Sequence, residues 1–141
     1  MRIGVTAKAL LVCLAAVLAG ASAAAQTPAS QNAQTATQFY VSYRQAFDKA
    51  KKIDDLLPYM AEKNRKQVAE TSAADRKQMF GVMKAMGAIT DLKVVKEDRQ
   101  PDGSAVLSCE GMDSDHKKST GKVMMVKEGG AWKVGDESWS S

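Results

Sequence analysis

The sequence predicts an α+β fold, with three N-terminal helices packed on a curved four-stranded antiparallel meander sheet. Two observations lead to this fold class. Apolar residues recur at helical spacing from residue 35 to residue 88, and from Thr90 onward they alternate with polar ones. Turns containing glycine or proline then divide the second half into consecutive strands. A run of helices followed by a run of hairpins is typical of helices that cover one face of a sheet.

The first 25 residues have the order of a secretory signal peptide. Arg2 and Lys8 precede or border an apolar run of 11 residues, 9–19, and small residues follow it up to Ala25. A helix needs roughly 20 apolar residues to span a bilayer, so this run is too short to be an anchor. We therefore predict cleavage after Ala25 or Ala23, a periplasmic or secreted location, and no membrane anchor.

The remaining chain is expected to form one domain. Residues 26–34 are polar and are predicted to form a disordered leader, and residues 35–141 form the single α+β domain. Without residues 1–25 the chain keeps 116 residues, with 18 basic and 16 acidic side chains and a net charge of +2. Because lysines and acids are interleaved along this chain, we expect no nucleic-acid partner.

The three predicted helices are amphipathic. The first begins at Thr35 or Thr37 and runs to about residue 52, with its aromatic residues on one face and Arg44 elsewhere on the wheel. The second covers 54–68, with Pro58 near its first turn. The third begins after Ser72 and ends near residue 87. Its apolar stripe is expected to be buried and consists of Met79, Phe80, Val82, Met83 and Met86.

The four predicted strands are 90–98, 104–112, 119–128 and 131–139. In the last strand Trp132 and Val134 alternate with a lysine, so their face is taken as the core. The third strand is apolar on both faces. Val123 and Met125 lie on one face, and Met124 and Val126 lie on the other. This pattern predicts that the outer face of the sheet is partly covered, which would allow a homodimer through the sheet.

Three segments resemble a known family. The first helix reads Phe-Tyr-x-x-Tyr-x-x-Ala-Phe from residue 39, Asp-Asp-Leu-Leu-Pro-Tyr-Met follows from residue 54, and Gly-Gly-Ala-Trp-Lys-Val follows from residue 129. The chain resembles the nuclear-transport-factor-two-like superfamily, of cystatin-like α+β cones, and in particular its small exported bacterial branch of unknown function. The resemblance implies a cone whose helices and sheet enclose a pocket open at one end.

That superfamily contains isomerases, dehydratases, ligand binders and interaction modules, so membership alone does not define a function. The family's enzymes use a pocket tyrosine with aspartates, or an aspartate–histidine pair. The single histidine of this chain, His116, is predicted to lie in an exposed turn. The resemblance therefore does not carry over histidine-dependent chemistry.

Tyr43 and Asp136 are the first candidate pair for polar chemistry. Tyr43 lies on the apolar face of the first helix, and Asp136 continues the face of Trp132 and Val134. A carboxylate on a core face is a candidate for acid–base work, whereas a frayed strand end would leave the same carboxylate in water. Cys109 shares an inward face with Leu107 and is predicted to be a small buried hydrophobic residue rather than a nucleophile.

The function predicted from these residues is that of a non-catalytic binding module with an apolar pocket for a small molecule. The alternatives are a sheet-mediated interaction or dimerisation module and, third, a small enzyme of the isomerase or dehydratase type. No cofactor is predicted. No metal site is predicted either, because the methionines that could bind copper coincide with the expected core stripe. The predicted pocket residues are Tyr43, Phe47, Met83, Leu107, Trp132 and Asp136.

Overall fold

The computed structural model describes residues 34–141. The predicted export signal, and all but the last residue of the predicted leader, lie outside the described residues. Within residues 34–141 no helix has both the length and the apolar character needed to cross a bilayer.

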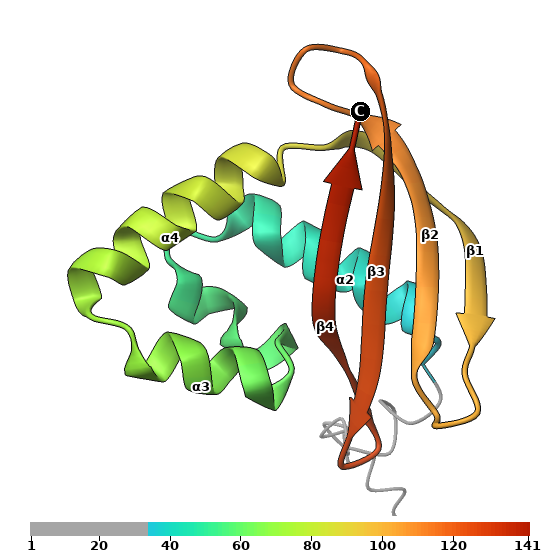
Figure 1. Ribbon diagram of the computed structural model, residues 1–141, viewed down its shortest axis with the longest axis horizontal. Coiled ribbons are helices and arrows are strands. Elements are labelled where there is room, and N and C mark those ends of the chain that lie inside the picture. The colour runs from blue at the N-terminus through green and yellow to red at the C-terminus, as the bar shows by residue number, and fades with distance from the viewer. Residues whose placement is uncertain (1–33) are drawn as a thin grey trace, which may run out of the picture.

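Helices precede strands along the described chain, which confirms the predicted α+β class (Figure 1). Neighbouring strands pair in the order β1-β2-β3-β4, each pair antiparallel, as a meander of three hairpins requires. The elements are α2 (Ala36–Lys49), the 3₁₀ helix η1 (Ile53–Tyr59), α3 (Glu62–Glu70), α4 (Ala73–Met86), β1 (Thr90–Arg99), β2 (Ala105–Met112), β3 (Lys118–Glu128) and β4 (Ala131–Ser140).

Helix α2 supplies most of the helical part of the core. Thr35 caps it in a capping box, because its hydroxyl accepts from the Gln38 N–H at 3.1 Å and the Gln38 side chain accepts from the Thr35 N–H at 3.0 Å. The helix crosses one face of the sheet (Figure 1). The core between them contains Phe39, Tyr40, Tyr43, Phe47, Leu107, Cys109, Val123, Met125, Trp132 and Val134.

The predicted second helix, 54–68, is wrong, because the chain forms two separate elements there. Met60 and Ala61 interrupt the helix in extended conformations. Met60 makes an isolated parallel bridge to Val134, and the Ala61 N–H donates to the Val134 carbonyl at 2.9 Å. This backbone pairing with β4 satisfies groups that a continuous helix would have used internally.

Helix α4 begins and ends as predicted, but its apolar stripe is only partly buried, with Met79, Phe80 and Met83 packed against the core. Ser72 accepts from the Asp75 N–H, and Gly87 follows the last helical residue. However, no residue of α4 is buried, and Val82 and Met86 are 51% and 74% exposed. The reason is its position, since α3 and α4 extend beyond the β4 edge of the sheet (Figure 1).

A β-bulge changes which residues of β4 point inward. Met125 pairs with Val134 but Met124 pairs with Asp136, so Gly135 has no partner residue on β3. The alternation shifts by one residue at this point. As a result Glu137 takes the inward face, Asp136 is exposed, and the predicted continuation of the Trp132–Val134 face to Asp136 is wrong.

Candidate functional site: the cleft between α4 and β4

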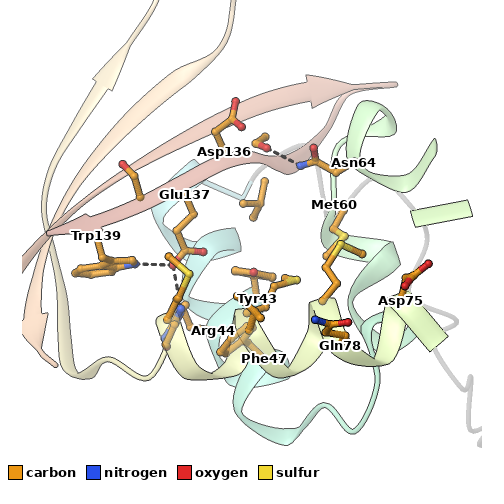
Figure 2. Close-up of a pocket in the computed structure, with 18 residues that line it drawn as sticks. Tyr43, Arg44, Phe47, Met60, Asn64, Asp75, Gln78, Asp136, Glu137 and Trp139 are labelled. Atoms are coloured by element: carbon orange, nitrogen blue, oxygen red, sulfur yellow. Dashed lines mark hydrogen bonds and ion pairs between the residues drawn. The ribbon is translucent and has the colours of Figure 1, made fainter. Parts of the chain in front are cut away.

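A cleft of about 750 Å³ lies between α4 and β4, with α2 at its base (Figure 2). Its size is within the range of small-molecule sites, which are also mostly apolar with a few converging polar groups. The apolar residues that line it are Tyr43, Phe47, Met60, Met79, Val82, Met83, Met86, Val134 and Trp139.

The α4 wall of this cleft is rich in methionine and keeps part of its apolar surface in contact with water. Met79 and Met83 are half-buried, and Met86 is exposed. Half-buried Met79, Phe80 and Met83 pack against the core, and polar contacts near the helix ends add to the attachment of α4. Arg76 pairs with Asp54 of η1 at 3.4 Å near one end, and Lys84 donates to a carbonyl at the end of α2 near the other.

Glu137 is the centre of the polar base of the cleft. Its Oε1 accepts three hydrogen bonds, from the Tyr40 hydroxyl at 2.8 Å, Arg44 Nη1 at 2.9 Å and Trp139 Nε1 at 2.8 Å. Figure 2 shows the Glu137 side chain pointing toward Arg44 while Asp136, the preceding residue, points away from it. Side chains from α2 and β4 therefore meet at one carboxylate oxygen.

Arg44 is buried and its charge is compensated. Besides its ion pair with Glu137, it donates from Nη2 to the Gly87 carbonyl at 2.6 Å. Its guanidinium also lies over the Phe47 ring, 4.7 Å from the centroid. Arg44 thus joins α2, the end of α4 and β4 through one side chain, and its charge is already compensated by Glu137.

Glu137 and the hydroxyl of Tyr43 lie together at the base of the cleft. Tyr40, Arg44 and Trp139 all donate to Glu137 Oε1, and none of these three donates to Oε2. The Tyr43 side chain is only 4% exposed, and a hydrogen bond to the Glu137 side chain is among the causes that raise its pKa. The cleft therefore offers a carboxylate acceptor next to a phenol.

The pKa values of both tyrosines at this site are raised. Burial is the main cause and the negative charge of Glu137 is the second, with Arg44 acting in the opposite direction. Tyr40 and Tyr43 are therefore neutral phenols at physiological pH. Each can donate a proton in a hydrogen bond without carrying charge into the cleft.

The structure brings together some of the predicted pocket residues and separates others. Tyr43, Phe47, Met83 and Asp136 border the cleft, although Asp136 is exposed. Leu107 and Trp132 are instead fully buried in the core and do not line the cleft.

The main residues that sequence reasoning missed are Glu137, Arg44 and Trp139. A signal for Arg44 was present, because it is spaced four residues after Tyr40 and three before Phe47 and so shares their helical face. The signal for Glu137 was weaker and consisted of Gly135 within the predicted strand. A glycine inside a strand often marks a β-bulge, after which the residues change faces.

Two further features of the described residues bear on chemistry, the Cys109 thiol and the grouping of possible metal ligands. Burial, followed by the charge of Glu137, raises the pKa of the Cys109 thiol to about 11, so the reactive thiolate is scarce at neutral pH. Within residues 34–141 no group of three or more histidine, cysteine, aspartate or glutamate side chains is placed to hold a metal ion.

Comparison of the chain with protein-family models, with curated proteins and with solved structures finds no match in any of the three.

Proposed function

We propose that this protein is an exported, non-catalytic binding module that takes a small apolar molecule in the cleft between α4 and β4. The observation that carries this proposal is the unburied apolar wall of α4 facing a cleft of about 750 Å³. An amphipathic helix normally gains its stability by burying its apolar face. Here that face is left available to a ligand.

The energetics favour occupation of the cleft by an apolar body. Each Å² of apolar surface removed from water contributes roughly 25 cal/mol. Half-buried Met79 and Met83, together with more exposed Val82 and Met86, would lose water-accessible surface to a ligand. Methionine is flexible and polarisable, so this wall can adapt to ligands of different shape.

Two further parts of the proposal concern architecture and location. The order of helices before a meander sheet, and a cleft that opens between them, support placing the domain among the nuclear-transport-factor-two-like cones. The signal-like pattern of residues 1–25 supports a periplasmic or secreted location.

A thermal-shift screen of a library of apolar small molecules tests the proposal, because a ligand that binds only the folded state raises the melting temperature. We expect stabilising compounds. Val82→Gln should weaken their effect because it places an amide on the apolar wall, without lowering the stability of the free protein by more than about 0.5 kcal/mol. Ala85→Gln is the matched control, because Ala85 is exposed on the same helix and does not line the cleft.

The proposal fails if no compound in the library shifts the transition. It also fails if Val82→Gln and Ala85→Gln leave every shift unchanged, since the compounds would then bind elsewhere. Native mass spectrometry of protein recovered from its own host adds an independent test, because a retained small molecule would appear as a defined mass increment.

The outer face of the sheet favours a second candidate function, a homodimer or a protein contact through the sheet. Met124 is 44% exposed on this face and pairs in register with Val106, whose side chain is half-buried. For this candidate, Met124→Glu should convert a dimer to a monomer in analytical ultracentrifugation. A protein that is monomeric at all accessible concentrations would exclude the homodimer.

A further inference from the structure

The charges that border the cleft are unequal. Three acidic side chains, Asp75, Asp136 and Glu137, border it together with one basic side chain, Arg44. Arg44 is paired with Glu137, whereas neither Asp75 nor Asp136 forms an ion pair with any residue from 34 to 141. The cleft therefore has an excess of negative charge, which attracts cations and repels anions.

The polar groups at the base of the cleft also favour a cationic ligand over an anionic one. Glu137 Oε2 can only accept hydrogen bonds, so a ligand group that binds it must be a donor. The hydroxyl of Tyr43 lies beside this carboxylate and can accept a second hydrogen bond from the same group. A carboxylate or phosphate head would face Glu137 without a free cation to receive it, since Arg44 is buried and its charge is already paired with Glu137.

We propose that the ligand is an amphipathic organic cation, with an apolar body against the α4 wall and a protonated amine that donates to Glu137 Oε2 beside Tyr43. This inference rests on the proposed function and names the chemical class of its ligand. An ammonium group has several donors and a full positive charge, so it can donate to Glu137 Oε2 and to the Tyr43 oxygen and also compensate the negative excess.

Three probes with the same eight-carbon chain test the head group: octylamine, octanol and octanoate. Isothermal titration calorimetry on the mature chain at pH 7 should show octylamine binding at least tenfold more tightly than octanol, and octanoate binding most weakly. The preference for octylamine over octanol should shrink as ionic strength rises, because salt screens the exposed carboxylates.

Charge variants assign the preference to this cleft. In the double variant Asp75→Asn/Asp136→Asn the affinity for octylamine should fall several-fold while the affinity for octanol stays unchanged. The control Glu70→Gln/Asp115→Asn removes the same charge from two exposed acids that do not border the cleft, and should leave both affinities unchanged. Glu137→Gln should abolish the preference for octylamine, and its octanol affinity reports whether the cleft is intact. If Glu137→Gln does not fold, the aspartate double variant decides.

The possible results distinguish failure of this inference from failure of the proposed function. Octanol or octanoate binding as tightly as octylamine would overturn the cationic class and leave an apolar binding module. An equal loss of octylamine affinity in the control double variant would also overturn it, because the preference would then come from net charge alone. If none of the three probes binds and no library compound stabilises the protein, the proposed function itself fails.

Discussion

Helices α2 and α4 have the same length, 14 residues, and both begin at a hydroxyl cap, yet α2 is buried in the core whereas α4 packs against the core with half-buried residues. Six residues of α2 are buried and none of α4 is. Helix α2 crosses the sheet, whereas α4 extends past its β4 edge (Figure 1). An apolar stripe therefore predicts a helix but does not show which other element covers that stripe.

The two helices also differ in how they are held. For α2 the main contacts are apolar, so most of its stabilisation comes from burial. Helix α4 is held near its ends by Arg76, Lys84 and the hydrogen bond from Arg44 to Gly87. Substitutions on the α2 side should therefore change the free energy of unfolding, and substitutions along α4 should change binding.

The largest effect is expected for Trp132→Ala, on the α2 side. Trp132 is fully buried, and its Nε1 donates at 2.9 Å to the carbonyl of Gln34, just before α2. Loss of this aromatic should lower the free energy of unfolding by about 3–5 kcal/mol, measured by urea denaturation. An unchanged denaturation midpoint would contradict the assignment of the core to this side of the sheet.

The same substitution in the two regions gives the sharpest comparison. Met125→Ala, in the core, should cost about 2–5 kcal/mol, because Met125 is fully buried on β3. Met86→Ala, on α4, should change the free energy of unfolding by less than about 0.5 kcal/mol. If the two variants lost similar stability, Met86 would be buried in solution and the cleft would be closed at this residue.

Breaking the polar base should have an intermediate effect. Glu137→Gln would leave the buried guanidinium of Arg44 without its counter-charge, which should cost about 2–3 kcal/mol. This is below the cost for a fully buried pair because the Glu137 side chain is 16% exposed. A double-mutant cycle with Arg44→Met measures the coupling, which should be at least about 1 kcal/mol.

Hydrogen exchange of the same Glu137→Gln variant connects this result with the comparison of helices. Weakening the Arg44 contact network should lower protection in the last turn of α4, near Gly87, more than in the middle of α2. A uniform loss of protection across both helices would show that the ion pair stabilises the whole domain and does not specifically hold α4.

Much of the fold could be predicted from sequence because it follows from local rules. The hydroxyl cap at Ser72, the stop near Gly87 and the glycine-rich hairpin before β4 are set by neighbouring residues, and the structure has them as predicted. The inward positions of Trp132 and Val134 follow from strict alternation.

The rest depends on contacts between distant segments. The break at Met60 comes from backbone pairing with β4, and the unburied face of α4 comes from where the sheet ends. The bulge at Gly135 caused the largest error in the predicted site. Because of this one extra residue, Glu137 and not Asp136 lies on the inner face of β4. Tyr43, Phe47 and Met83 were placed beside the cleft by their helical spacing alone.

The smallest expected effect concerns the start of α2, which is tied to β1 in a way that α4 is not. Glu97 Oε2 accepts from the Thr37 N–H at 3.0 Å and from the Thr37 hydroxyl at 2.6 Å, and Oε1 accepts from Arg99 Nε. Partial burial of Glu97 opposes ionisation, but these hydrogen bonds outweigh it and hold the pKa of the carboxyl below its usual value.

A lowered pKa in the folded state means that this carboxylate stabilises the fold above the pKa of the unfolded chain and loses its contribution as the pH falls through the folded pKa. Glu97→Gln should therefore cost about 1 kcal/mol at pH 7, where a charged acceptor near the start of a helix is favourable. In urea denaturation from pH 7 down to pH 3, the difference from the unsubstituted protein should shrink toward the acid end. Glu70→Gln, at an exposed position on α3, is the control and should show no such convergence. A cost for Glu97→Gln that stays constant with pH would mean that the tie between α2 and β1 depends on the shape of the side chain and not on its charge.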